Sequence, residues 1–157
     1  MPRENVADKI QHATLTLERS YSAPVERVFS AFADPIARAQ WSPASGDMFI
    51  YDEADFREGG RDRFRCGPKG DARFHGETTY HLIVENKLVI SSETVETDGQ
   101  RLAVSLNTLH LEPGGDGTKL RLTVQMVSLM GEGMIAGYEA GNKGALENLA
   151  RYLNAKP

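Results

Sequence analysis

The histidines come first in a search for chemistry, because imidazole is a common metal ligand and acid–base group. His75 and His81 fall in one predicted strand, separated by about 20 Å at the usual rise of a strand. His110 belongs to another predicted strand, and His12 lies near the N-terminus. No metal-ligand spacing results, so we predict exposed or structural histidines, no metal site and no cofactor.

The single cysteine and the glycine-rich runs do not indicate catalysis either. Cys66 ends a predicted strand before Gly67-Pro68, and no neighbour in the sequence would activate its thiol. The runs GGDG and REGG precede strands, whereas a phosphate-binding loop continues into Lys, Ser or Thr and a helix. We therefore predict turns at both runs, and we find no nucleophilic triad.

The more informative residues are aromatic and methionine side chains with a few polar ones, a combination typical of small-molecule pockets. We predict that a ligand cavity is lined by Trp41, Met48, Ile50, Phe56, Phe64, Phe74, Tyr80, Leu106, Met126, Met130, Met134, Tyr138 and Asn142. Tyr80, Tyr138 and Asn142 are the polar residues expected to meet a ligand. Glu139 joins them if the last helix is rotated, and Tyr138 with Glu139 could then support acid–base work. The alternative is that these side chains simply fill the core.

The N-terminal part of the sequence predicts one strand and two short helices. Alternation in ATLTLERSY indicates a strand with one buried face. Apolar residues then recur at helical spacing in VERVFSAF, after Pro24 at the first helical position. Asp34-Pro35 ends that helix and opens the next, with Asp34 as N-cap and Trp41 at the end.

From about Asp47 to Val127 the sequence predicts six strands joined by short turns, an antiparallel meander. Alternation assigns one face of three of these strands. Its members are Phe74, Gly76, Thr78, Tyr80, Leu82 and Val84, then Leu102, Val104 and Leu106, then Leu120, Leu122, Val124 and Met126.

The last element is a helix of roughly 20 residues, EGMIAGYEAGNKGALENLARYLN, with apolar residues at helical spacing. Gly133, Gly137, Gly141 and Gly144 interrupt it. They indicate a close approach to a strand, room for a ligand beside the helix, or a flexible helix start that gates the cavity.

Length and charge limit the class of protein. The 157 residues fit a single domain over 1–157, with residues 1–12 as a flexible N-terminal tail. The net charge of −4 and the lack of a dense Lys/Arg cluster argue against nucleic-acid binding. Without a secretory signal or a long apolar run, we expect a cytoplasmic protein with no membrane span. The element order predicts an α+β fold, a curved antiparallel sheet of six or seven strands around a long C-terminal helix.

The sequence resembles the START-like, helix-grip superfamily, and more closely the family grouped with the C-terminal domain of the activator of Hsp90 ATPase. The resemblance rests on SAPVERVFSAFADPIARAQW, FREGGRDRF, FHGETTYHLIVENKLVI, GDGTKLRLTVQM and GNKGALENLARYL. It covers about Ala13 to Leu153, and it implies a six- or seven-stranded sheet around the last helix with a cavity between them. Many relatives have an aromatic residue where this chain has Asn142.

The resemblance leaves three functions open, since superfamily members bind lipids, hormones or polyketides, transform small molecules, or contact proteins. We expect a small hydrophobic-ligand-binding protein, monomeric or homodimeric, because no catalytic constellation is recognisable. The first alternative is a co-chaperone-like module acting on Hsp90; the eukaryotic co-chaperone has a further N-terminal domain that this sequence has no room for, which argues against it. The second is a cyclase- or hydratase-like enzyme that uses Tyr80, Tyr138 or Glu139.

Overall fold

The computed structural model describes residues 3–44 and 46–155. Its elements are α1 (Arg3–Ala7), β1 (Gln11–Tyr21), α2 (Val25–Ala33), α3 (Pro35–Trp41), β2 (Asp47–Glu53), β3 (Arg61–Pro68), β4 (Phe74–Val84), β5 (Leu88–Thr97), β6 (Gln100–Gly114), β7 (Gly117–Ser128) and α4 (Glu132–Ala155). The predicted order of strand, two short helices, six strands and long helix is confirmed. The segment expected as a tail contains α1, and β1 already begins at Gln11.

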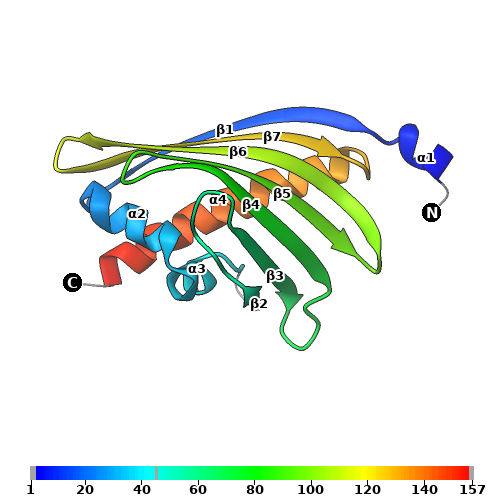
Figure 1. Ribbon diagram of the computed structural model, residues 1–157, viewed down its shortest axis with the longest axis horizontal. Helices are drawn as coiled ribbons and strands as arrows, with labels where there is room; N and C mark the ends of the chain where they lie inside the picture. The colour runs from blue at the N-terminus through cyan, green and yellow to red at the C-terminus, as the bar shows by residue number, and fades with distance from the viewer. Residues whose placement is uncertain (1–2, 45, 156–157) are drawn as a thin grey trace.

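The strands form one antiparallel sheet of seven, in the order β1-β7-β6-β5-β4-β3-β2. The sheet curves around α4, which crosses its concave side, while α2 and α3 close one end (Figure 1). This is the α+β helix-grip fold. The concave side of the sheet is called the inner face below, and the convex side the outer face.

The two short helices begin and end as the prolines require. Pro24 was predicted as the first residue of α2. It is the N-cap, so the helix begins one residue later, at Val25. The Asp34 carboxylate accepts a hydrogen bond of 2.9 Å from the backbone N–H of Ile36, so Asp34 caps α3 as predicted. Asp34 is also the C-cap of α2, so the chain turns at this residue, and α3 packs against both α2 and α4.

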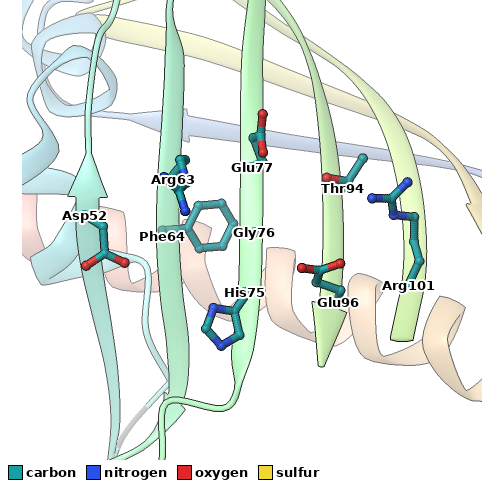
Figure 2. Close-up of a pocket in the computed structure, with 9 residues that line it drawn as sticks. All are labelled: Asp52, Arg63, Phe64, His75, Gly76, Glu77, Thr94, Glu96 and Arg101. Atoms are coloured by element: carbon teal, nitrogen blue, oxygen red, sulfur yellow. The ribbon is translucent and has the colours of Figure 1, made fainter. Parts of the chain in front are cut away.

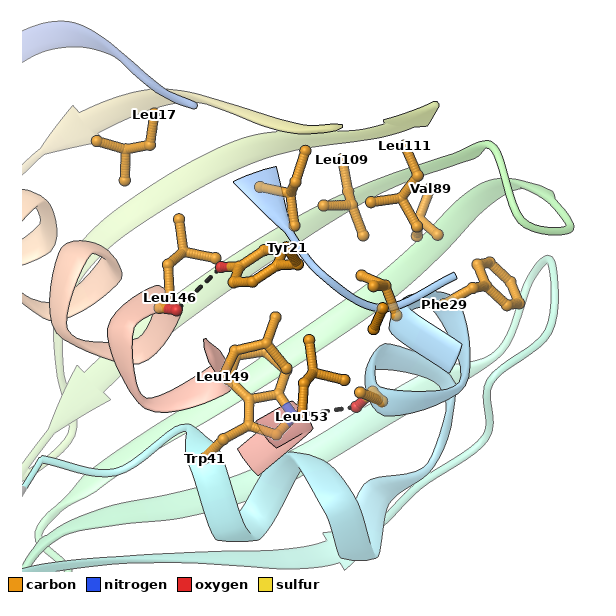
Figure 3. Close-up of a cluster of buried hydrophobic side chains, with 14 of the residues drawn as sticks. Leu17, Tyr21, Phe29, Trp41, Val89, Leu109, Leu111, Leu146, Leu149 and Leu153 are labelled. Carbon is orange, nitrogen blue, oxygen red and sulfur yellow. Dashed lines mark hydrogen bonds between the residues drawn. The ribbon is translucent and has the colours of Figure 1, made fainter. Parts of the chain in front are cut away.

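The C-terminal half of α4 is anchored in the main hydrophobic core (Figure 3). Leu146, Leu149 and Leu153 are almost fully buried there. The Tyr21 hydroxyl donates to the Leu146 carbonyl at 2.9 Å, and the Trp41 indole N–H donates to the Ala31 carbonyl at 3.1 Å. These buried hydrogen bonds tie α4 to β1 and α3 to α2.

Two β-bulges shift the predicted strand faces. Between Tyr80 and Leu82 an irregularity in β4 reverses the alternation, so Ile83 packs on the core while Leu82 and Val84 are exposed. The prediction that Leu82 and Val84 share the face of Tyr80 is therefore wrong.

The second bulge lies between β5 and β6, at Val95 and Glu96. It places Ala103 and Ser105 on the inner face and leaves Val104 and Leu106 on the outer face, 38% and 41% exposed. The predicted face of β6 is wrong beyond Leu102, which is itself buried. On β7 no bulge intervenes, and Leu120, Val124 and Met126 are buried as predicted.

The glycines of α4 do not mark a close approach to a strand. A methyl group added at Gly133, Gly137, Gly141 or Gly144 would meet no atom within 4 Å, apart from neighbouring residues and the helix backbone. The first three glycines are exposed. The close-approach explanation is therefore wrong, and a flexible start of α4 stays a prediction.

Candidate functional site

A row of polar side chains crosses the middle of the inner face. Cross-strand pairing places Asp62 of β3 beside Thr78 of β4, Thr78 beside Glu93 of β5, and Glu93 beside Ser105 of β6. Residues paired in this way project from the same face of a sheet. The next row contains Tyr80, also directed inward. Polar groups thus occupy the part of the sheet that normally packs as apolar core.

At one end of this row, Arg38 of α3 forms a buried ion pair with Asp62. The Arg38 Nη1 donates to Asp62 Oδ2 at 2.6 Å and to the Tyr80 hydroxyl at 2.8 Å. The Tyr80 hydroxyl also donates to Asp62, and the backbone N–H of Asp55 donates to Asp62 Oδ1 at 3.1 Å. Asp62 is fully buried and Arg38 is 8% exposed. The ion pair therefore fixes α3 to the inner face, although Nε and Nη2 of Arg38 are buried without a hydrogen-bond partner among the described residues.

Aromatic rings from β2 and β3 surround this ion pair. The Arg38 guanidinium carbon lies 4.7 Å from the centre of the Tyr51 ring, a cation–π contact. Phe49 and Phe64 stack with ring centres 4.7 Å apart, and Tyr51 lies 6.1 Å from Phe64. Burial raises the pKa of Tyr51, and burial also raises that of Tyr80. Both hydroxyls are therefore neutral donors at physiological pH.

Glu93 is the ionisable group at the centre of the inner face. It lies deep in the fold, and burial raises the pKa of its carboxyl to about 7, an increase that the nearby Tyr138 and Thr78 hydroxyls oppose. Yet Glu93 is only half-buried by its accessible surface. A deep carboxyl that keeps accessible surface can meet a small molecule.

Tyr138 of α4 faces Glu93 from the helix side. Its phenol packs with Met134 and Ile135 against the smaller hydrophobic cluster of Leu15, Ala103, Val124 and Met126. Burial raises the pKa of the Tyr138 hydroxyl, and the adjacent Glu93 raises it further. The hydroxyl oxygens of Tyr138 and Ser105 are buried without a well-formed hydrogen bond among the described residues. A carboxyl that titrates near neutrality beside such a phenol can hold or transfer a proton.

The structure brings several of the predicted cavity residues to this region. Phe64 and Tyr80 are buried on the inner face, and Tyr138 projects from α4. Met126 and Met134 pack around Tyr138. Phe56, in the loop after β2, packs edge-to-face against Tyr80, with the ring centres 4.9 Å apart. Phe74 is half-buried at the start of β4.

Other predicted residues lie elsewhere. Trp41 belongs to the main core, with its N–H already bonded to Ala31. Met48 and Ile50 occupy the opposite face of β2 from Phe49 and Tyr51, since Ile50 pairs with Arg65 and Tyr51 with Phe64.

The last of the predicted residues belong to β6, to the turn before α4 and to α4 itself. Leu106 is on the outer face of β6. Met130 lies in the turn, where its sulfur accepts a hydrogen bond of 3.5 Å from the Gln100 side-chain amide. The Asn142 amide donates to the carbonyl of Tyr138 at 2.9 Å, within its own helix. Glu139 pairs with Lys143 at 3.0 Å, both about half exposed, so Glu139 is a solvent-facing residue of α4.

Sequence reasoning missed Arg38, Asp62, Glu93 and Ser105. A signal existed for Asp62, because in RDRFRC it shares the parity of Phe64 while three arginines occupy the other parity. Glu93 likewise shares the parity of Val89 and Val95. Arg38 and Ser105 become recognisable only through the packing of α3 and the bulge at Leu102 in β6.

A separate pocket of about 130 Å³ lies on the outer face (Figure 2). It is lined by Asp52, Arg63, Phe64, His75, Gly76, Glu77, Thr94, Glu96 and Arg101. Charged side chains of both signs alternate across it. Such a surface is typical of a solvated sheet face, and we do not assign it a ligand.

The described residues contain neither a metal-binding cluster nor a membrane-spanning helix. Among residues 3–44 and 46–155, no group of three His, Cys, Asp or Glu side chains could hold a metal ion. Over the same ranges, no helix has both the length and the apolar character needed to cross a bilayer.

Comparison with protein families gives one match, the model of activator of Hsp90 ATPase homolog 1-like protein, over residues 22–154. The chain belongs to this family. The match includes Arg38, Asp62, Glu93 and Tyr138. No curated protein matches the sequence.

Solved structures agree with this assignment. A protein from Rhizobium leguminosarum is 31% identical with a TM-score of 0.83, covering 94% of this chain and 98% of that one. A protein from Rhizobium loti is 33% identical with a TM-score of 0.80, covering 92% and 99%. A third, from Chromobacterium violaceum, is 27% identical with a TM-score of 0.76, covering 88% and 94%. The family and the fold are thus established, while family membership alone does not define an activity.

Proposed function

We propose that this protein binds a small amphipathic molecule between the inner face of the sheet and α4. The observation that carries the proposal is Glu93, a deep but accessible carboxyl in a polar row, beside the buried hydroxyls of Tyr138 and Ser105. A buried polar group without a good partner costs about 1–3 kcal/mol. Two such groups at one place, the hydroxyls of Tyr138 and Ser105, favour a ligand that completes their hydrogen bonds.

The surroundings of the polar row favour an apolar body for this ligand. Phe49 and Phe64 lie on one side, and Met126 and Met134 on the other. Aromatic and methionine walls with few polar groups are typical of small-molecule sites. We therefore propose an amphipathic binding site, with the polar groups at its centre, in place of the expected hydrophobic cavity.

Binding of a small-molecule library tests this proposal, with thermal unfolding as the first readout and native mass spectrometry for stoichiometry. We expect at least one amphipathic compound to raise the melting temperature and bind once per chain. Ser105→Leu should abolish binding by filling the inner face, whereas Thr108→Leu, on the outer face of the same strand, should not. A library without any binder would contradict the proposal, as would a compound that binds the Ser105→Leu protein equally well.

A co-chaperone-like module is the second candidate, favoured by apolar residues on the outer face. Leu82 and Val84 of β4 and Val104 and Leu106 of β6 are 38–41% exposed. Exposed apolar groups of this kind can mark a protein interface. If this candidate holds, the wild-type chain should stimulate the ATPase of Hsp90, and Leu82→Ser with Leu106→Ser should remove the stimulation. An unchanged ATPase rate would oppose it.

An enzyme of the cyclase or hydratase type is the third candidate. Glu93 replaces Glu139 as the acid–base residue, because Glu93 lies beside Tyr138 and titrates near neutrality. Any activity found should fall sharply in Glu93→Gln and Tyr138→Phe. Full activity in both variants would exclude this role. Cytoplasmic location and a monomeric or homodimeric state stay predictions, which cell fractionation and light scattering measure.

A further inference from the structure

The charges enclosed between the sheet and the helices are unequal. Arg38 and Asp62 neutralise one another in their ion pair at 2.6 Å. Among the described residues, the groups that influence the Glu93 carboxyl are the hydroxyls of Tyr138 and Thr78, and no cation is one of them. When Glu93 is ionised, the interior therefore has one uncompensated negative charge.

The other ionisable groups near Glu93 do not remove this imbalance. Burial raises the pKa of Cys66 on β3 to about 11, and it raises those of Tyr51 on β2 and Tyr138 on α4. All three are neutral at physiological pH. On β3 the remaining charged group of the row is Asp62, which Arg38 of α3 already occupies. A ligand bound here would therefore have to balance the negative charge of Glu93.

The aromatic residues near the polar row suit a cation as well. Tyr138 packs beside Glu93 from α4, and Phe49, Tyr51 and Phe64 form a contiguous set of rings on β2 and β3. One of these rings already holds the Arg38 guanidinium at 4.7 Å. The faces of aromatic rings attract organic cations. A carboxylate removed from water also accepts strong hydrogen bonds from a cationic donor.

We propose that the ligand of this protein is an organic amine, whose ammonium group pairs with the Glu93 carboxylate between the Tyr138 and Ser105 hydroxyls. This inference rests on the proposed function and specifies its ligand class. An ammonium group supplies up to three N–H donors, enough for the carboxylate and both hydroxyl oxygens. A carboxylate ligand would instead add a second negative charge beside Glu93.

The test uses two sets of probes; within a set the aromatic group is the same and the polar end is an amine, an alcohol or a carboxylate. The phenyl set is phenethylamine, phenethyl alcohol and hydrocinnamate. The indole set is tryptamine, tryptophol and indolepropionate. Affinities are measured by calorimetry at about pH 8 and about pH 5.5, on either side of the Glu93 titration. We expect the amine to bind at least about 10-fold more tightly than the alcohol at the higher pH, with the carboxylate weakest. The amine preference should shrink at the lower pH, because protonation neutralises Glu93.

Glu93→Gln is the decisive variant, and Glu96→Gln on the outer face of the same strand is its matched control. The first should abolish the amine preference while the alcohol still binds, and the second should preserve the preference. Equal affinities of amine and alcohol, or an amine preference that survives Glu93→Gln, would overturn this inference and leave the proposed function standing. If no probe of either set binds, the amine inference is contradicted, while the library screen still decides the proposed function.

Discussion

At the scale of single residues, Glu93 is the side chain whose environment departs most from its ordinary one. The inner face of a sheet normally carries apolar side chains and not carboxyls, because burial of a charged carboxylate is unfavourable. Burial raises the pKa of Glu93 to about 7, so the ionised carboxyl destabilises the folded state above neutral pH.

Replacing Glu93 by glutamine should stabilise the protein increasingly as the pH rises. The folded-state pKa of about 7 exceeds the ordinary value of 4.5 for a glutamate carboxyl, so the native state binds more protons than the unfolded state between these values. Stability contributed by the protonated carboxyl is present below about pH 4.5 and is lost as the pH rises through about 7. The unfolding free energies of Glu93→Gln and wild type should therefore diverge by roughly 3 kcal/mol from about pH 4 to about pH 8.

Urea unfolding at several pH values provides this measurement. Glu96→Gln serves as the outer-face control and should not reproduce the divergence. A difference between Glu93→Gln and wild type that stays constant over the whole range would show that Glu93 titrates normally.

The Arg38–Asp62 pair makes a second prediction at this scale. Asp62→Asn leaves the buried Arg38 charge without its counterion, which should reduce the free energy of unfolding by about 3–5 kcal/mol. Asp52→Asn breaks the exposed pair of Asp52 with Arg65, held by contacts of 2.8 and 2.9 Å, and should change stability little. Equal effects in chemical denaturation would mean that the buried pair contributes no more than a surface pair.

At the scale of elements, the sequence predicted the seven strands and the helices α2, α3 and α4, but neither α1 nor the bulges of the strands. The apolar spacing of VERVFSAF and the Asp34-Pro35 pair were sufficient for α2 and α3, because capping and proline geometry are local. A bulge depends on the partner strand, so the faces of Leu82 and Leu106 could not be read from their own segments. The same shift hid Ser105.

The helix glycines give a prediction for α4. Gly137→Ala and Gly141→Ala should each raise the free energy of unfolding by about 0.5–1 kcal/mol, because alanine restricts the unfolded chain and no atom outside the helix lies within 4 Å of the added methyl group. Gly76→Ala is the opposite case, since its methyl group would lie 2.0 Å from the Phe64 ring. It should destabilise by about 1–3 kcal/mol.

Thermal and urea unfolding of the three variants distinguish these effects. Destabilisation by both helix substitutions would show that the α4 glycines are required for packing. Hydrogen exchange of Gly133–Gly144 tests the flexible helix start separately: protection equal to that of the C-terminal half of α4 would remove it.

At the scale of the whole molecule, the fold was predictable and the site was not. Element order, alternation and the family resemblance were enough for a sheet of six or seven strands around a long helix, and the sheet has seven. The polar row needs four strands in register and a helix above them, so no single segment of the sequence reveals it. Sequence reasoning selected Tyr80 and Tyr138 as candidates from residue type, and did not name their partners Asp62 and Glu93.

The site between the sheet and α4 is tested most directly by intermolecular nuclear Overhauser effects between the protein and bound phenethylamine, or tryptamine if that amine binds more tightly. We expect contacts from the ligand to the side chains of Thr78, Ser105 and Tyr138, which face one another across the interior. Contacts only to Leu82, Val84 or Leu106 would place the ligand on the outer face and contradict an interior binding site.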